Sequence, residues 1–337
     1  MAYSKEMHDK ARAEIKKRKN DAENTAAQRK AELTAKYPEF QFIESELAKT
    51  GYETIKAFSL PKEKAEAELQ RIREKNKILR TERGNLLTAL KLPKDYLDVK
   101  YTCEKCEDTG ICEDYDADRQ VSYGSEYCEC YLDILKKCAA VDLNRSTPLT
   151  LSSFEEFNLE FYPNANMNGY NPRREMTDVF NNCQGYARNF SKDSNSLYFY
   201  GRTGLGKTHL SLAIANSAIQ MGYNVIYGSI ITFINKMEKE KFNKADSQID
   251  TESLLVDADL LILDDLGAEF STAFTTSALY NIINSRIAKG VPTIISSNLS
   301  PSELKERYPE SIASRIIGMY VNVEFIGKDV RQIMNED

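Results

Sequence analysis

One glycine-rich stretch, residues 201–208, has the residue types and spacing that phosphate binding requires. It reads GRTGLGKT and fits the pattern G-x-x-x-x-G-K-[ST] at every fixed position. The apolar run SLYFYG precedes it, and THLSLAIANSAIQMG follows with helical spacing. This strand–turn–helix context lets the glycine-rich backbone curl so that its N–H groups face phosphate oxygens at a helix N-terminus. The stretch therefore predicts a nucleotide-binding P-loop.

Each residue of this loop has an expected role. Lys207 is predicted to reach the β- and γ-phosphates of ATP, and the Thr208 hydroxyl to hold Mg²⁺. The residues expected to contact the nucleotide are Gly201, Arg202, Thr203, Gly204, Leu205, Gly206, Lys207 and Thr208.

A second stretch, ADLLILDDLGAE, ends an apolar run in two adjacent carboxylates, Asp264 and Asp265. Burying neighbouring carboxylates is costly without a cation, which favours a metal site. We expect Asp264 to hold Mg²⁺, directly or through water, and to contact the nucleotide site. We expect Asp265 to polarise the attacking water as a general base.

A third apolar run, VPTIISSN, ends in Asn298. Asn commonly starts turns, but this one lies one strand and one helix after the carboxylate pair. That position favours a catalytic role, in which the side chain hydrogen-bonds the γ-phosphate or the attacking water.

Seven cysteines occur, and five lie between Cys103 and Cys130. Cys103 and Cys106 form C-x-x-C, a spacing that lets two thiolates share one tetrahedral metal. Cys128 and Cys130 form a second pair, and the two histidines are distant in sequence. Four cysteine ligands for a structural Zn²⁺ are therefore expected, although Cys112 could replace Cys128 or Cys130.

Composition divides the chain into three parts. Residues 1–97 are rich in Lys, Glu, Ala and Arg and predict three polar helices, the second over residues 40–49. They form either a solvated helical arm or a docking module for a partner. Residues 98–145 are the Cys-rich module. Residues 150–337 alternate apolar strands with amphipathic helices, which predicts an α/β domain with a parallel sheet.

Charge and hydropathy limit the function classes. The net charge is −6, but the first 100 residues carry +6, which is compatible with nucleic acid or an acidic protein partner. No run approaches the ~18 apolar residues that a membrane span needs, and the first residues lack the apolar core of a signal peptide. We expect no membrane association and a cytoplasmic protein.

With these residues in hand, the C-terminal part resembles the AAA+ ATPases of the bacterial replicative-helicase loader group. This is the DnaC/DnaI-like branch, which includes IstB-type transposition helpers. The matching stretches are GRTGLGKTHLSLAIA, ADLLILDDLGAE, NSRIAKGVPTIISSNLS and RYPESIASRIIGMYVNVEF. The Cys-rich segment and the helical arm look more like the DnaI side.

The resemblance implies further features. Arg315 matches the arginine finger that reaches a neighbouring subunit's nucleotide, and Arg331 matches the second sensor arginine. The domain is expected to lack a separate helical lid. The C-x-x-C…C-x-C layout of zinc-bearing loaders favours the ligand set Cys103, Cys106, Cys128 and Cys130. Most AAA+ enzymes carry Glu where this chain has Asp265, which favours a slow switch over a fast motor.

The expected function is ATP-dependent loading of the hexameric replicative helicase onto single-stranded DNA during replication initiation, with the helical region of residues 1–97 docking onto the helicase. ATP binding would favour self-association, and hydrolysis would release the loader. One alternative is an IstB-type transposition helper that acts on double-stranded DNA. The other is a zinc-containing DNA-binding adaptor with a vestigial ATPase.

Overall fold

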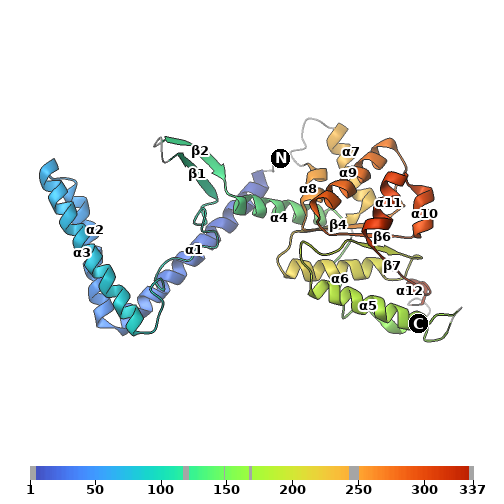
Figure 1. Cartoon of the computed structure of the whole chain (residues 1–337), viewed down its shortest axis with the longest axis horizontal. Coiled ribbons are helices and arrows are strands. Elements are labelled where there is room, and N and C mark those ends of the chain that lie inside the picture. The colour runs from blue at the N-terminus through green and yellow to red at the C-terminus, as the bar shows by residue number, and fades with distance from the viewer. Residues whose placement is uncertain (1–4, 117–120, 148, 167–168, 243–249, 334–337) are drawn as a thin grey trace. The chain divides into compact units, whose positions relative to one another are not determined.

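The computed structural model (Figure 1) describes residues 5–333 except 117–120, 148, 167–168 and 243–249; the side chains of 62–63 and 113–125 are also not described. The chain divides into two compact units, Ala11–Leu132 and Met1–Lys10 with Asp133–Asp337. None of the described helices is both long enough and apolar enough to cross a membrane.

The three expected helices are α1 (Lys5–Lys36), α2 (Pro38–Ala57) and α3 (Lys62–Ala89), and all but the first residues of α1, Lys5–Lys10, belong to the first unit. Pro38 lies in the first turn of α2, where the missing N–H has no intrahelical acceptor. α2 and α3 pack as an antiparallel hairpin, with the Thr50 hydroxyl 2.7 Å from Asn76 Oδ1. α2 runs to Ala57, which is further than the expected range of 40–49, because apolar residues recur at helical spacing along its whole length.

The Cys-rich segment contains an antiparallel hairpin, β1 (Ile111–Asp116) and β2 (Val121–Tyr127), and then helix α4 (Glu129–Arg145). Cys103 and Cys106 precede the hairpin, and Cys128 and Cys130 lie where β2 gives way to α4. The hairpin returns the chain, so that the two cysteine pairs meet at its base.

The second unit is an α/β domain around a five-stranded sheet whose order is β4-β5-β6-β3-β7 and whose pairs are all parallel. This confirms the predicted fold class. The strands are β3 (Leu197–Tyr200), β4 (Val225–Ser229), β5 (Leu260–Leu266), β6 (Thr293–Ser297) and β7 (Val321–Glu324).

Helices cover both faces of this sheet (Figure 1). One face carries α5 (Pro172–Arg188) and α6 (Lys207–Gln220). The other carries α7 (Ile230–Phe242), α8 (Thr251–Asp257), α9 (Ala273–Lys289), α10 (Pro301–Arg307) and α11 (Glu310–Met319). Between β7 and residue 333 the described chain adds only α12 (Val330–Ile333), so these residues form no helical lid.

The core of the domain explains why the strands read as continuous apolar runs. The four residues of β5 before its carboxylates are fully buried, as expected for a parallel sheet covered on both faces. One cation, Arg286 of α9, is also fully buried. Its guanidinium donates to the Thr293 hydroxyl and to the carbonyls of residues 255, 256, 258 and 292. Burial lowers its pKa to about 10.

Candidate nucleotide and metal sites

The P-loop lies between β3 and α6, and its glycines are required by the backbone. Gly201, Gly204 and Gly206 have φ of 139°, 78° and 85°, a region that disfavours other residues. A Cβ at Gly201 would overlap the Phe325 carbonyl, and one at Gly204 would overlap the Asp329 carboxylate. The glycines therefore allow both the turn and the close approach of the C-terminal segment.

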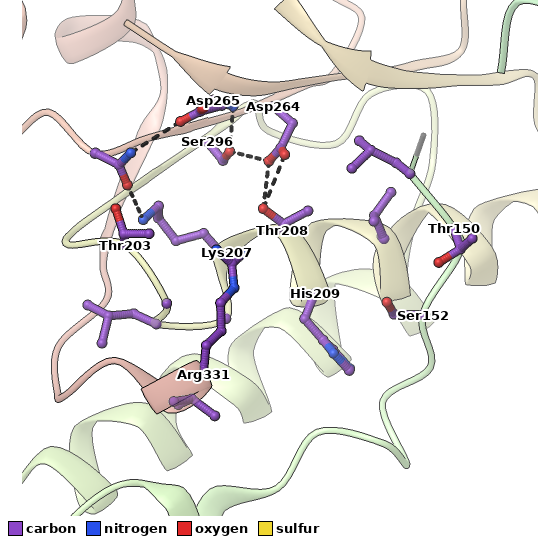
Figure 2. Close-up of a pocket in the computed structure, with 17 residues that line it drawn as sticks. Thr150, Ser152, Thr203, Lys207, Thr208, His209, Asp264, Asp265, Ser296 and Arg331 are labelled. Atoms are coloured by element: carbon purple, nitrogen blue, oxygen red, sulfur yellow. Dashed lines mark hydrogen bonds between the residues drawn. The ribbon is translucent and has the colours of Figure 1, made fainter. Parts of the chain in front are cut away.

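The loop forms one wall of a pocket of about 590 Å³, a size typical of nucleotide and cofactor sites (Figure 2). Ten of the predicted site residues line it, namely Thr203, Gly204, Leu205, Gly206, Lys207, Thr208, Asp264, Asp265, Asn298 and Arg331. Gly201 and Arg202 line an adjoining hollow. Arg315 lines neither of these two cavities.

The Lys207 ammonium is buried and has three acceptors. It donates to the carbonyls of Gly201 and Arg202, at 2.7 and 2.8 Å, and to Asn298 Oδ1 at 2.9 Å. Burial lowers the pKa of Lys207 to about 8, which outweighs the opposing effect of the nearby carboxylates. A desolvated cation held only by neutral oxygens favours an anion such as a phosphate.

The two adjacent carboxylates point in different directions. Asp264 is buried, and its oxygens accept from the Thr208 hydroxyl at 2.9 and 3.1 Å. Burial raises the pKa of Asp264. Asp265 is exposed, and its Oδ1 accepts from Asn298 Nδ2 at 3.1 Å. Asn298 therefore connects Lys207 to Asp265.

A β-bulge produces this divergence. The register of β5 against β6 shifts between Leu263 and Leu266, and Asp265 takes a left-handed φ of 60°. Ser296 fills the gap, because its hydroxyl donates to Asp264 Oδ1 and accepts from the Asp265 N–H at 3.1 Å. The next hydroxyl, on Ser297, donates to the Leu266 carbonyl. Bulges beside active sites commonly redirect side chains in this way.

Sequence reasoning did not identify Ser296. The available signal was the pair of serines in the otherwise apolar strand TIISS, because buried hydroxyls need partners.

The C-terminal segment closes the phosphate end of the pocket. The Val330 N–H donates to the Gly204 carbonyl at 2.9 Å, which places Arg331 on the pocket wall. Figure 2 shows Arg331 beside Lys207, and its positive charge contributes to the lowered pKa of that lysine. The predicted second sensor arginine therefore lies in the same pocket as the P-loop lysine.

Arg315 lies on α11 and is held against α9. Its Nε donates to Asn284 Oδ1 at 3.1 Å, and its guanidinium lies 5.1 Å from the centroid of the Tyr280 ring. The side chain is half-buried in this position. Within one chain it is not part of the pocket, so its predicted role requires a second subunit.

The pocket also has apolar lining. Leu149, Leu212 and Val330 supply it. His209 Nε2 donates to the Ser153 carbonyl at 2.8 Å, and its ring contacts Phe157 edge-on. These contacts hold the segment before α5 along α6. Apolar lining in the same pocket as a phosphate-binding loop suits a planar base.

The four predicted zinc ligands meet in the first unit. The sulfurs of Cys103, Cys106, Cys128 and Cys130 all lie within 4.8 Å of one another. Cys103 Sγ is 3.7 Å from Cys128 Sγ, and Cys106 Sγ is 3.4 Å from Cys130 Sγ. A tetrahedral site with Zn–S bonds of about 2.3 Å has sulfurs about 3.8 Å apart, so the donor set fits Zn²⁺. Cys112 is not one of the four.

A buried carboxylate orders the loop that holds the first pair. Asp108 accepts from the N–H groups of Thr102 and Cys103, at 2.7 and 3.0 Å. It therefore fixes the backbone before Cys106 without contributing a ligand itself.

Comparisons with known proteins agree with this geometry. Residues 182–316 match the family model described as IstB-like ATP binding protein. The replicative helicase loader DnaI of Bacillus subtilis is 34% identical over 118 residues, which are 34% of this chain and 37% of that protein. A replicative helicase loader DnaC of Buchnera aphidicola is 29% identical over 161 residues, 47% of this chain and 65% of that one. The chain thus spans between about a third and two thirds of these relatives.

Solved structures are also similar to this chain. The crystal structure of the DnaC helicase loader has a TM-score of 0.43 at 21% identity, covering 51% of this chain and 98% of that one. The crystal structure of DnaI has a TM-score of 0.40 at 21% identity, covering 53% and 90%.

Proposed function

We propose that this chain is an ATP-dependent loader of a replicative DNA helicase, because residues 182–316 match the model of the IstB-like ATP-binding proteins and parts of the chain are similar to proteins named replicative helicase loaders. The hexameric helicase would be placed on single-stranded DNA. The observation that carries the proposal is the convergence of Lys207, Asp264, Asp265 and Asn298 on one P-loop pocket. This convergence supports ATP binding and hydrolysis, and the names of the relatives, replicative helicase loaders, support the loading role.

The hydrolysis step follows from the pocket. Lys207 and the P-loop N–H groups bind the phosphates, and Asp265 accepts the proton of a water that attacks the γ-phosphorus. The bond from that phosphorus to the bridging oxygen breaks, which leaves ADP and inorganic phosphate. Mg²⁺, held at Thr208 and Asp264, would neutralise charge on the phosphates. Asn298 orients the water, since its amide already contacts Asp265.

Nucleotide binding would also act as a switch. In the structure all three protons of the Lys207 ammonium are directed to oxygens of the chain. A γ-phosphate competes for that ammonium and so loosens its bond to Asn298, which in turn contacts Asp265. Arg315 of a second subunit would complete the site, and this makes self-association depend on ATP.

Contact with single-stranded DNA is supported by one exposed region. The Phe270 side chain is 90% exposed just before α9. Four residues on, the half-buried Phe274 ring has Lys241 5.0 Å from its centroid. An exposed aromatic ring can stack on a base, and a lysine can contact a phosphate.

Zn²⁺ would have a structural role in the first unit, because its four sulfurs join two segments that the β1–β2 hairpin brings together. Metal binding can supply folding free energy to such a small segment.

The test is light scattering of the full chain mixed with the replicative helicase of the same organism, with and without ATP, for wild type and Lys207→Ala. We expect a complex whose size depends on ATP in wild type only. Absence of a complex under all conditions would refute loading. Binding to double-stranded DNA would then favour the IstB-type transposition helper. A wild type without ATP turnover would favour the DNA-binding adaptor.

A further inference from the structure

The loop that follows the carboxylate pair contains a buried acid, Glu269, which is only 5% exposed. Burying a carboxylate is costly unless its oxygens accept hydrogen bonds. Here Oε2 accepts from the Gly267 N–H at 2.9 Å, and Oε1 accepts from the Tyr308 hydroxyl. The next residue, Phe270, is 90% exposed. Glu269 therefore anchors the loop at the point where the chain passes from the interior to the surface.

The backbone of this loop turns sharply just after the carboxylates. Asp265 and Gly267 have left-handed φ of 60° and 105°, and the Ala268 N–H donates to the Asp265 carbonyl at 3.2 Å. The loop also lies close to the residue after Asn298, because a Cβ on Gly267 would be 2.9 Å from Leu299 Cδ1. The bond from the Gly267 N–H to the Glu269 carboxylate therefore fixes the backbone two residues from Asp265.

The other partners of Glu269 lie at the junction between α10 and α11. Tyr308 is buried there, and its N–H donates to the Leu304 carbonyl at the end of α10. Arg307 donates from Nη2 to the Glu269 carbonyl at 2.7 Å. Both junction residues thus bind Glu269, one at its side chain and the other at its backbone. Helix α11, which carries Arg315, starts two residues after Tyr308.

Glu269 is not placed to act on the nucleotide itself. It does not line the pocket that holds Lys207 and Asp265. Both of its carboxylate oxygens already accept hydrogen bonds from the chain, so neither is directed to an attacking water. An effect of Glu269 on hydrolysis must therefore pass through the position of Asp265.

We propose that Glu269 is a positioning residue that links the α10–α11 junction to the Asp265 carboxylate. Asp265 is the general base only under the proposed function, on which this inference rests. A second subunit that contacts α11 would displace Tyr308, and Glu269 would transmit that displacement to the loop of Asp265. The hydrolysis rate of one subunit would then depend on whether its own α11 is engaged, through a chain of hydrogen bonds within one domain.

A purely structural role for this pair predicts a different outcome. Loss of the bond between Glu269 and Tyr308 would then lower the free energy of unfolding but leave the turnover of the folded protein unchanged. A positioning pair lowers kcat as well. KM should stay nearly constant in that case, because the bonds from the P-loop to the phosphates are not altered.

The experiment measures steady-state ATP turnover of the full chain, at a temperature where denaturant unfolding shows every variant to be folded. Tyr308→Phe removes the hydroxyl and keeps the ring. Tyr186→Phe is the matched control, because it removes a hydroxyl that donates to the Asn195 carbonyl at 2.8 Å on α5 and the turn after it. Glu269→Ala removes both side-chain bonds. In Glu269→Gln the amide can still accept from the Gly267 N–H and donate to the tyrosine oxygen.

We expect kcat to fall about tenfold or more in Glu269→Ala and Tyr308→Phe, because a small displacement of a catalytic group is costly. KM should stay within about twofold of wild type. Glu269→Gln should recover most of the lost turnover, and Tyr186→Phe should keep the kcat of wild type. The double variant Glu269→Ala with Tyr308→Phe should be no slower than Glu269→Ala, because the effects of residues that act as a unit do not add.

Three results would overturn this role. If wild type hydrolyses ATP and Tyr308→Phe is as fast as Tyr186→Phe, the inference is wrong while the proposed function stands. The same holds if Glu269→Gln is as slow as Glu269→Ala, or if the two losses multiply in the double variant. If wild type does not hydrolyse ATP, the ATPase activity of the proposed function fails and this role of Glu269 fails with it.

Discussion

Replacing Ser296 by alanine should separate metal binding from nucleotide binding. In the structure its hydroxyl donates to Asp264 and accepts from the N–H of Asp265, so one atom orients both carboxylates. The alanine variant leaves that N–H and one carboxylate oxygen without this partner. An unsatisfied buried polar group costs about 1–3 kcal/mol, which is the expected decrease in the free energy of unfolding. Removing a partner that orients a metal ligand typically weakens metal binding about 10–100-fold.

The assay is binding of a fluorescent ATP analogue as a function of Mg²⁺ concentration, together with denaturant unfolding. For Ser296→Ala we expect unchanged affinity without Mg²⁺, a midpoint in Mg²⁺ raised about 10–100-fold, and slower turnover. Ser297→Ala is the matched control, because it removes a hydroxyl of the same bulge that donates to the Leu266 carbonyl and accepts from the Leu299 N–H, without a described hydrogen bond to Asp264 or Asp265. It should lose stability but keep the Mg²⁺ midpoint. Ser296→Thr keeps the hydroxyl and should restore the midpoint.

Two outcomes would refute this reasoning. The first is a Mg²⁺ midpoint in Ser296→Ala equal to that of wild type. The second is an equal shift in both serine variants, since the effect would then come from general loosening of the bulge.

Three other predictions concern single side chains. Burial lowers the pKa of Lys207 from 10.5 to about 8 in the folded protein. Below pH 8 the lysine is charged in both states, and the full cost of burying that charge then lowers the free energy of unfolding. The nucleotide-free protein should therefore gain stability from pH 8 to 10.5 relative to Lys207→Met, and parallel stability-against-pH curves for the two proteins would contradict this. Asp265→Glu should slow ATP turnover about tenfold or more, because the longer side chain loses its bond to Asn298 and a left-handed φ suits Asp better than Glu. Turnover equal to or faster than that of wild type would contradict this role of Asp265. Metal analysis should find one Zn²⁺ per chain in wild type and Cys112→Ser but none in Cys106→Ser, whose first unit should melt earlier in circular dichroism; zinc retained in Cys106→Ser would exclude this ligand set.

The P-loop, the strand with the carboxylate pair and the parallel α/β fold could be predicted because each depends on local pattern. Lys207 follows a strand and starts a helix within a single short motif. The partners of Asp264 could not be predicted, since they arise from a register shift between strands about 30 residues apart. The bulge also gives a physical reason for Asp at position 265, where the resemblance in sequence leads one to expect Glu. The left-handed backbone at residue 265 is more compatible with Asp than with Glu.

The Cys-rich segment shows a different limit. Its polar, turn-like composition does not indicate that helix α4 begins at Glu129, the residue between the proposed ligands Cys128 and Cys130. The ion pairs along α3 could not be predicted from the sequence either. Arg71 and Arg73 look alike in sequence, but only the packing of α2 against α3 determines that Arg71 has carboxylate partners.

The buried Arg286 has a consequence for the order in which the elements of the α/β domain unfold. Its guanidinium bonds the end of α8, the start of β6 and the loop before that strand, while its backbone belongs to α9. Separating any one of these elements would leave a buried cation short of acceptors, which is among the more costly defects in a protein interior. α8, α9 and β6 should therefore open as one cooperative unit, and their slowest amide protons should exchange with a common free energy.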